Sequence, residues 1–397
     1  MNQSTSAFSK AEKKIYTSCC YIFLTNGALA LLVGTLLPYI RDSYGLNYQI
    51  AGFLVSAHAI GNLISSFLGG VLPLRIGRKR TAVLLCSCGI IAFLIIVATG
   101  NSVLLILAFF LTGINRGAVS NFNNAVVNDI ATGKAWAFNL LHAIFCIGAF
   151  LAPFLVVLLT KNNPDNWYIA ALIEAFFVLT EVILLLKMDV PNNFPQKEAA
   201  GSTDWGFLKN RQFIAASGIL FSYLCAEQAV NGWLVTYLKD SGIMSASFSQ
   251  IMTGVLWLVI LGGRLLSAVL STKVKKSILL LFSCIGYLIF FILLITSRSA
   301  APVAVGIIGI GFFMAGLYPT TVACAGDVIK AYPLSLSILL TITSLGAILM
   351  PSIIGIVAKR VGIVGGMSTI IVAVIVTFGF IVYNVIINRE QTDANHH

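Results

Sequence analysis

Apolar stretches of about 20 residues, separated by short polar segments, run along almost the whole chain of 397 residues. An α-helix rises about 1.5 Å per residue, so such a stretch crosses the roughly 30 Å of hydrocarbon in a bilayer. Segments of about ten residues with alternating polarity, which are typical of membrane β-barrels, do not occur. The pattern predicts an all-α polytopic membrane protein with twelve spans. Their expected bounds are 15–40, 49–72, 81–99, 103–127, 136–160, 168–187, 212–238, 249–271, 278–297, 302–325, 335–357 and 365–388.

The distribution of basic residues predicts how these spans are oriented. Only 10% of residues are charged and the net charge is +11. The basic residues lie in short loops, which argues against a nucleic-acid partner. If both termini are cytoplasmic, only six of the 25 Lys and Arg residues lie outside, as the positive-inside rule requires. These six are Arg41, Lys161, Lys239, Arg298, Lys359 and Arg360. We therefore expect a multi-pass protein of a bacterial plasma membrane.

The chain divides into two similar halves. The polar, proline-containing segment 188–211 predicts a cytoplasmic linker between six-helix bundles at 1–187 and 212–397. GAFLAP at 148–153 recurs as GAILMP at 346–351, and PYIRDS at 38–43 recurs as TYLKDS at 236–241, both offset by 198 residues. Six spans per half is an even number, so the repeat is parallel. In transporters built this way, solute sites lie near the bilayer midplane between the repeats.

The loop after the second span carries a motif of a known transporter family. GGVLPLRIGRKR (69–80) resembles the loop between the second and third helices of the major facilitator superfamily. The resemblance implies gating roles for Arg75, Gly77 and Arg78. The family's aspartate is replaced here by Leu74, so the two arginines need other partners, such as helix C-termini.

Further segments resemble the fucose/galactose/glucose permease-like branch of that superfamily. They are NAVVNDI (124–130), FNLLHAIFCIGAFLAP (138–153), AEQAVNGW (226–233) and GLYPT (316–320). The resemblance implies a sugar as the solute. Two acidic positions of proton-coupled fucose permeases are occupied here by Gly34 and Ser120, so proton symport by that route is in doubt.

The fourth span contains an unusually polar stretch, GINRGAVSNFNNAVVND (113–129). At 100° per residue its polar side chains form a band about 160° wide, which suits a helix lining a wet cavity. The equivalent stretch of the second half, 311–327, is mostly apolar. We therefore expect hydrogen-bonding groups to be concentrated in the N-terminal half.

Ionisable residues at membrane depth are functional candidates, because a charge there costs several kcal/mol. We place coupling at Glu227, with a structural ion pair to Arg264 or Arg116 as the alternative. For Arg264 itself we favour a structural role. His142 suits a hydroxylated ligand or helix packing equally. Trp233 can stack on a sugar ring or pack against the protein. The further candidates are Glu174, Glu181 and His58, and the sequence assigns no role to the two glutamates.

The sequence as a whole predicts a secondary transporter that moves a small polar solute, most simply a sugar, by alternating access. It contains no nucleotide-binding P-loop, HExxH or GxSxG motif, so we expect neither an ATPase nor an enzyme. We expect no cofactor beyond a coupling ion, H⁺ or Na⁺, and a monomer. Transport of an organic anion, favoured by Arg116, and efflux or flipping of an amphipathic molecule are the alternatives. The expected solute-binding residues are Asn26, Arg116, Asn121, Asn124, His142, Glu227, Gln228, Asn231 and Trp233.

Overall fold

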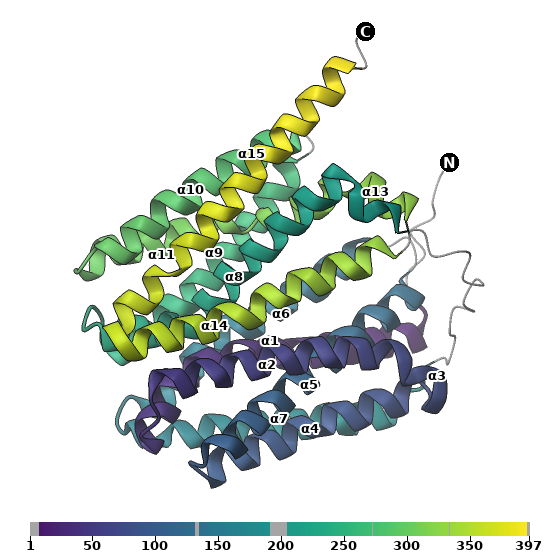
Figure 1. Cartoon of the computed structure of the whole chain (residues 1–397). Coiled ribbons are helices and arrows are strands. Elements are labelled where there is room, and N and C mark those ends of the chain that lie inside the picture. The colour runs from purple at the N-terminus through teal and green to yellow at the C-terminus, as the bar shows by residue number, and fades with distance from the viewer. Residues whose placement is uncertain (1–7, 132–134, 191–204, 272, 333, 395–397) are drawn as a thin grey trace. The chain divides into compact units, whose positions relative to one another are not determined.

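The computed structural model describes residues 8–131, 135–190, 205–271, 273–332 and 334–394, and these residues contain helices and no strand (Figure 1). Two short 3₁₀ turns, Pro164–Asn166 and Gly206–Lys209, precede α7 and α8. The α-helices are α1 (Lys10–Tyr44), α2 (Tyr48–Val71), α3 (Pro73–Ile76), α4 (Arg78–Ala98), α5 (Ser102–Ile130), α6 (Ala135–Thr160), α7 (Trp167–Lys187), α8 (Arg211–Asp240), α9 (Ala246–Leu270), α10 (Lys276–Thr296), α11 (Ala300–Met314), α12 (Leu317–Cys324), α13 (Gly326–Ala331), α14 (Ser335–Ser368) and α15 (Ile370–Ala394).

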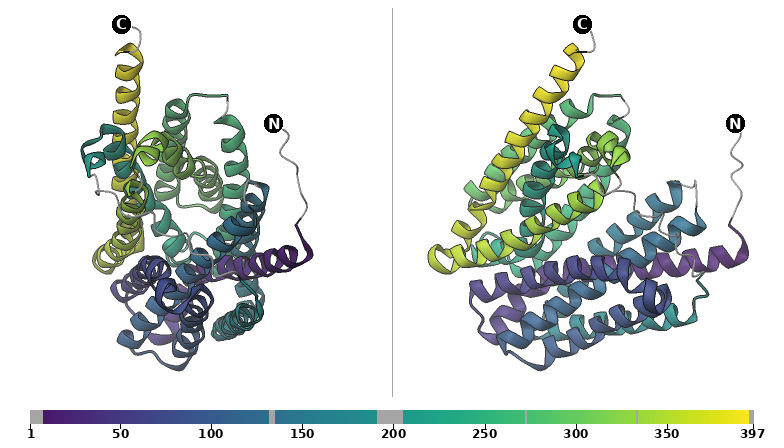
Figure 2. Two further views of the ribbon diagram at one scale, coloured as in Figure 1. Left: turned by 90° about the vertical axis from the view of Figure 1, so that its right-hand side faces the viewer. Right: turned by 45° about the vertical axis from the view of Figure 1, so that its right-hand side comes forward.

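Eleven helical stretches of the described residues are long and apolar enough to cross a membrane. The last of them, Ser335–Arg389, contains α14 and most of α15 and therefore covers two predicted spans. This stretch bends near its middle at Gly362. The φ of Gly362 is +82°, a conformation that glycine adopts without steric cost. Helix α14 ends six residues later at Ser368, and Figure 2 shows the chain reversing sharply between α14 and α15. The twelve predicted spans all correspond to helical segments.

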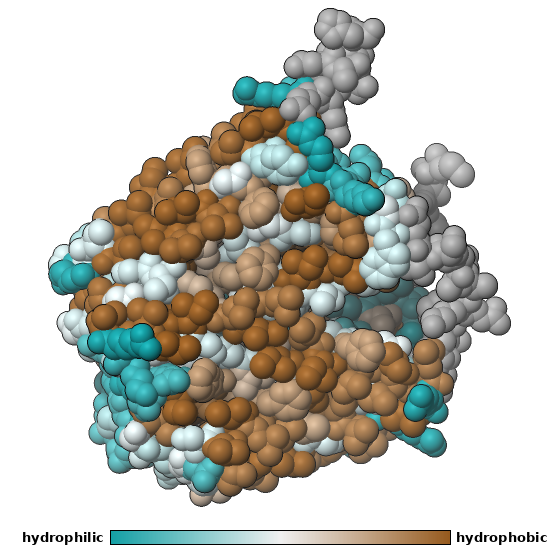
Figure 3. Space-filling model, in the orientation of Figure 1, coloured by the Kyte–Doolittle hydropathy of each residue, from teal (hydrophilic) through white to brown (hydrophobic). Residues whose placement is uncertain are grey.

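The surface of the helices has the character expected of a membrane protein. Residues such as Phe67, Leu158 and Leu265 expose between 64% and 76% of their surface. In Figure 3, apolar residues cover most of the visible helical faces and hydrophilic residues gather towards their ends. Lipid solvates such apolar surface without penalty, so these side chains need no protein partner.

The chain forms two compact units. The first contains Met1–Leu46 and Ala57–Pro195, and the second contains Asn47–Ser56 and Gln196–His397. The start of α2 therefore groups with the C-terminal helices, whereas the sequence places all of α2 in the N-terminal bundle. Most of the predicted linker 188–211, namely residues 191–204, lies outside the described residues.

Equivalent close contacts occur inside each unit. In the first unit, Gly113 of α5 packs on α2, where an added Cβ would overlap the carbonyl oxygen of His58. In the second unit, a Cβ on Gly311 of α11 would lie 3.0 Å from the carbonyl oxygen of Leu256 on α9. Gly311 stands 198 positions after Gly113, and Leu256 stands 198 positions after His58. This is the offset of the sequence repeat. The two bundles therefore share pseudo-symmetric packing.

One predicted span is interrupted. The segment expected at 302–325 consists of α11 and α12, which are separated at Ala315 and Gly316. Pro319 has no N–H to donate to the carbonyl four residues earlier, and its ring disfavours a regular helix at that point. Its counterpart in the repeat, α5, runs unbroken for 29 residues.

Candidate functional site

The polar stretch of the fourth predicted span forms the second half of α5. Asn101 caps this helix by accepting hydrogen bonds from the backbone N–H groups of Val103 (3.0 Å) and Leu104 (3.2 Å). The helix then continues to Ile130. Its polar side chains consequently lie around one continuous helix, and their contacts separate them into two groups.

Two α5 asparagines hold neighbouring helices together. Nδ2 of Asn115 donates to the carbonyl oxygen of Cys86 on α4 (2.9 Å), and Nδ2 of Asn123 donates to that of Cys19 on α1 (3.4 Å). Both asparagines are fully buried. Burying an amide without a partner is costly, so these hydrogen bonds fix the helix packing of the first unit. Neither side chain was predicted to bind the solute.

Asn121 and Asn124, which were predicted to bind the solute, have different surroundings. Asn121 is half-buried, and its Nδ2 donates to the backbone carbonyls of Ser65 (3.3 Å) and Ser66 (3.2 Å) on α2. Asn124 is also half-buried, but its Oδ1 is buried and has no hydrogen-bond partner. Asn124 therefore retains an acceptor for a ligand hydroxyl, whereas the amide hydrogens of Asn121 are used on α2.

Asn26 connects α1 to the same face of α5. Its Nδ2 donates to Oγ of Ser120 (3.1 Å), and its buried Oδ1 has no hydrogen-bond partner. On α6, His142 is exposed and its ring lies edge-on to Phe23, with centroids 5.3 Å apart. An exposed imidazole can both donate and accept hydrogen bonds. Oδ1 of Asn26 thus remains as an acceptor for a polar solute.

Arg116 belongs to a chain of polar groups between α5 and α2. Its Nη1 lies 3.5 Å from Nε2 of His58, and Nδ1 of that imidazole lies 2.8 Å from Oγ1 of Thr112. His58 is buried and Arg116 is half-buried. Because a guanidinium stays charged in proteins, the first unit has a positive charge at membrane depth.

In the second unit, Glu227 on α8 faces Arg264 on α9. Oε1 of the carboxylate lies 4.0 Å from Nη2 of the guanidinium, and the Glu227 side chain is only 9% exposed. This distance is the limit for an ion pair and is longer than the 2.7–2.9 Å of a charge-assisted hydrogen bond. The sequence analysis gave a structural ion pair between Glu227 and Arg264 as one alternative to a coupling role. The structure brings these two residues together, but at a distance too long for a hydrogen bond.

Three tyrosines around this ion pair were missed by the sequence analysis. Tyr223 is fully buried within hydrogen-bonding reach of Glu227. Tyr287 and Tyr318 lie within electrostatic range of the same carboxylate. Tyr223 had a detectable signal, because it stands four residues before Glu227 and thus on the same helix face. The other two come from distant segments, which only the fold brings together.

The other predicted α8 residues differ in accessibility. Gln228 is half-buried, and Asn231 is 9% exposed with an Oδ1 that has no hydrogen-bond partner. Trp233 is completely buried, and its Nε1 donates to the carbonyl oxygen of Pro351 (3.2 Å). In this structure Trp233 therefore adopts the packing role of its two alternatives, with no face open to a ligand.

The predicted gating loop has one defined ion pair. Gly77 adopts a φ of +87° between α3 and α4, a turn that favours glycine. The next residue, Arg78, is buried and forms an ion pair with Asp129 in the last turn of α5. Arg75 is exposed. Asp129 is thus a partner of Arg78 in this structure.

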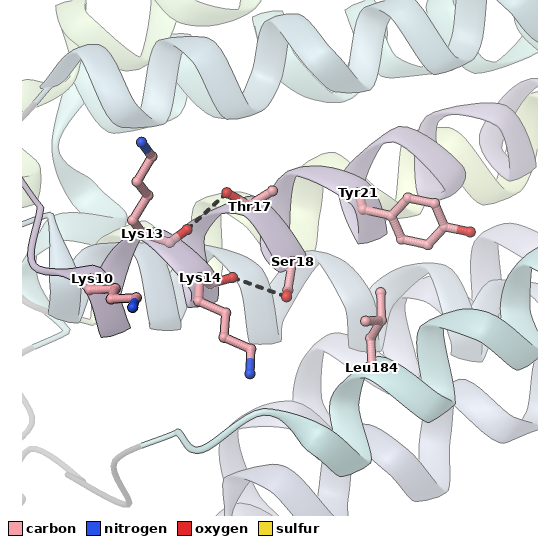
Figure 4. A pocket seen from close by; sticks show the side chains of 7 residues that line it. All are labelled: Lys10, Lys13, Lys14, Thr17, Ser18, Tyr21 and Leu184. Atoms are coloured by element: carbon pink, nitrogen blue, oxygen red, sulfur yellow. Dashed lines mark hydrogen bonds between the residues drawn. The ribbon is translucent and has the colours of Figure 1, made fainter.

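A separate groove of about 440 Å³ lies between α1 and α7 of the first unit (Figure 4). None of the predicted solute-binding residues lines it. Its lining residues are Lys10, Lys13, Lys14, Thr17, Ser18, Tyr21 and Leu184.

Comparison with known proteins identifies the family. The family model described as Major Facilitator Superfamily matches residues 19–331. The chain belongs to the Major Facilitator Superfamily. It is a membrane-spanning secondary transporter for small molecules and not an enzyme.

Two relatives of this transporter come from Bacillus subtilis. The uncharacterized MFS-type transporter YfkL is 24% identical over 365 residues, covering 89% of this chain and 90% of YfkL. The glucose/mannose transporter GlcP is 24% identical over 326 residues, covering 78% of this chain and 79% of GlcP. Among solved structures, the D-xylose-proton symporter matches with a TM-score of 0.76 at 15% identity, covering 94% of this chain and 97% of the symporter. This last similarity shows a shared fold.

Proposed function

We propose that this transporter carries a small hydroxyl-rich solute, specifically a sugar, by alternating access. One observation carries the proposal: Asn26, Asn124 and Asn231 each keep a buried amide oxygen without a hydrogen-bond partner. Unpaired buried acceptors are costly, and sugar hydroxyl groups are donors that would satisfy them. The similarity to the glucose/mannose transporter GlcP supports the choice of solute class. Arg116, Asn121, His142 and Gln228 complete the proposed set of binding residues.

Glu227 is the proposed coupling residue, with a proton as its ion. Its carboxyl group is buried, and its Oε1 lies 4.0 Å from Nη2 of Arg264. Ionised Glu227 is stabilised by Arg264, whereas protonated Glu227 can bond to a hydroxyl of the solute or of Tyr223. A structural ion pair remains the competing role for Glu227.

Uptake by purified transporter in proteoliposomes tests both assignments. We expect an inward proton gradient to drive accumulation of D-glucose or D-mannose above the external concentration. Glu227→Gln should abolish this accumulation but keep sugar exchange across the membrane without a gradient. The matched control Asp165→Asn, on an exposed loop residue, should behave as wild type. If Glu227→Gln still accumulates sugar, the coupling assignment is wrong.

Transport of an organic anion is the second candidate function. It rests on Arg116, which places a guanidinium at membrane depth beside His58. Anion uptake that is lost in Arg116→Gln, combined with no sugar uptake, would favour this candidate. Efflux of an amphipathic molecule would instead appear as transport of a hydrophobic dye with neither sugar nor anion uptake.

We further propose a monomer in a bacterial plasma membrane with both termini cytoplasmic and residues 188–211 as the linker between bundles. The excess of Lys and Arg in the loops assigned to the inner side supports this orientation. Protease accessibility of a C-terminal tag in right-side-out and inverted vesicles tests it. Light scattering from purified protein tests the monomer.

A further inference from the structure

Helix α7 carries two buried carboxyl groups that the proposed mechanism does not use. Glu174 and Glu181 are each 1% exposed. They stand seven residues apart, about two turns, so they lie on one face of the helix about 10 Å apart along its axis. The opposite face exposes Phe176 (60%), Leu179 (43%) and Ile183 (40%). An apolar face thus covers the outside of α7, and both acids point into the first unit.

Side chains from three other helices surround these acids. The hydroxyl of Thr25 on α1 donates to Oε1 of Glu181. Asn115 of α5 lies beside Glu181 and is anchored by its bond to the Cys86 carbonyl on α4. A Cβ on Gly89 of α4 would lie 3.0 Å from Cγ of Asn115 and 3.1 Å from Val178 of α7. Three helices, α1, α4 and α5, therefore surround the α7 segment that carries the two carboxyl groups.

Several oxygen acceptors in this interior have no hydrogen-bond partner. Both carboxyl oxygens of Glu174, Oε2 of Glu181 and Oδ1 of Asn115 are buried and have no hydrogen-bond partner. Within the described part of the chain, neither glutamate forms an ion pair. The titratable group facing Glu181 from α4 is the thiol of Cys86, and the groups facing it from α1 and α5 are the neutral Thr25 and Asn115.

Two unpaired negative charges in such an interior would be strongly destabilising. A buried carboxylate without a cation costs several kcal/mol, and a second one nearby adds repulsion. A proton on a carboxyl group removes the charge and supplies the O–H donor that the unpaired oxygens lack. A bound proton therefore removes the buried charge without any additional ligand.

We propose that Glu174 and Glu181 form a proton-binding site in the first unit, separate from Glu227. The two carboxyl groups hold protons in the conformation described here, and Thr25 and Asn115 position Glu181. Exchange of a proton at this site accompanies the transport cycle. This last part rests on the proposed transport function, whereas proton occupancy does not.

Infrared spectroscopy of the purified protein tests the occupancy directly. Protonated and ionised carboxyl groups absorb at different frequencies, so Glu174→Gln and Glu181→Gln should each remove intensity from the protonated carboxyl region at neutral pH. Asp165→Asn, the exposed control, should remove intensity only from the carboxylate region. Both glutamine variants should fold, because a neutral amide resembles a protonated carboxyl group in shape. If both variants lose intensity only in the carboxylate region, the proposal is overturned.

A transport measurement tests separately whether a proton exchanges at this site during the cycle. In proteoliposomes, the double variant Glu174→Gln/Glu181→Gln should lose proton-driven D-glucose accumulation down to the level without a gradient, while exchange of D-glucose persists. If the double variant accumulates D-glucose to the wild-type level, the proposed proton exchange at Glu174 and Glu181 is wrong. If wild type transports no sugar at all, the proposed function fails, and the infrared result still decides whether the site binds protons.

The lysine groove in Figure 4 carries a second, independent inference. Lys10, Lys13 and Lys14 occupy the first turns of α1, where the chain has three cationic groups beside the hydroxyls of Thr17 and Ser18. Leu184 of α7 and the ring of Tyr21 on α1 form the apolar side of the groove. The groove thus combines positive charge with apolar surface at one end of two membrane helices.

We propose that this groove binds the anionic phosphate headgroup of a phospholipid, with an acyl chain along α7. Basic pockets between membrane helices on the cytoplasmic side have this ligand chemistry. The orientation rests on the topology proposed above, and the lipid contact can be tested without any transport measurement.

Thermal unfolding in nanodiscs tests the lipid contact. Phosphatidylglycerol should raise the Tm of wild type relative to phosphatidylcholine, and Lys10→Gln/Lys13→Gln/Lys14→Gln should lose this shift. Lys209→Gln/Lys273→Gln/Lys275→Gln, which removes the same charge from exposed positions, should keep it. An equal shift in both triple variants would contradict the proposal. So would stabilisation by inorganic phosphate equal to that by the lipid, because it would identify a free anion as the ligand.

Discussion

Gly148 of α6 packs directly on Leu24 of α1, so closely that a Cβ atom on the glycine would overlap the leucine carbonyl oxygen. Gly346 of α14 has the same relationship with the carbonyl of Phe221 on α8. The two glycines open the GAFLAP and GAILMP repeats. The repeated sequence therefore encodes a repeated helix contact, one in each unit.

These contacts predict a clear difference between glycines. Gly148→Ala and Gly346→Ala should each destabilise the protein by about 1–3 kcal/mol, the usual effect of forcing an extra carbon into a packed interior. Gly262→Ala is the matched control, because nothing lies within 4 Å of its added Cβ. Thermal unfolding in detergent measures all three. Equal Tm values for the three variants would contradict the close packing.

The two groups of asparagines on α5 should respond differently to substitution. Asn115→Ala removes the bond to the Cys86 carbonyl from a fully buried site and should destabilise the protein by about 1–3 kcal/mol. Asn124→Ala removes an acceptor that has no protein partner, so it should raise the KM for sugar while leaving Tm unchanged. Paired measurements of Tm and uptake separate these outcomes. A normal KM in Asn124→Ala would exclude it from the binding site.

Trp233→Phe distinguishes packing from sugar stacking. The phenylalanine ring keeps an aromatic face but cannot donate to the Pro351 carbonyl, so we expect a stability loss of about 0.5–1.5 kcal/mol and an unchanged KM. Tm and concentration-dependent uptake measure the two effects. A raised KM with unchanged Tm would instead assign Trp233 to the solute.

The Arg78–Asp129 ion pair should behave as one unit. Arg78→Gln and Asp129→Asn should each slow transport and lower stability, because each leaves a partly buried charge without its partner. The loss of stability in the double variant should be smaller than the sum of the losses in the two single variants. Arg75→Gln is the control, since Arg75 is exposed and the contact described for this loop is made by Arg78. Additive effects of the single substitutions would show that the pair is not coupled.

Much of the fold could be predicted from the sequence. A helix that crosses a bilayer must be about 20 residues long and mostly apolar, and such stretches are easily recognised in the sequence. The six-plus-six repeat was visible in short motifs, and the matched glycine contacts confirm it. The interruption at Gly316 was not predicted, since Pro319 was interpreted within a family pattern rather than as a helix breaker. The grouping of Asn47–Ser56 with the second unit depends on packing and has no local signal.

The candidate site was harder to predict for a physical reason. Helical periodicity gives the side of α5 on which an asparagine lies, but not whether a backbone carbonyl of another helix stands opposite. Asn115 and Asn124 therefore looked alike until their neighbours were known. Of the tyrosines near Glu227, only Tyr223 is related to it by helical spacing, whereas Tyr287 and Tyr318 come from other helices.

The break between α11 and α12 gives the second unit backbone hydrogen-bond acceptors that its apolar side chains do not indicate. Where a helix is interrupted, carbonyl groups of the last turn lose the amide donors that a continuous helix would provide. Pro319 removes one such donor outright. Main-chain oxygen is present whatever the side chain, so no single substitution deletes it. A stretch that looks apolar in the sequence can thus contribute hydrogen-bond acceptors that an alanine scan would never detect.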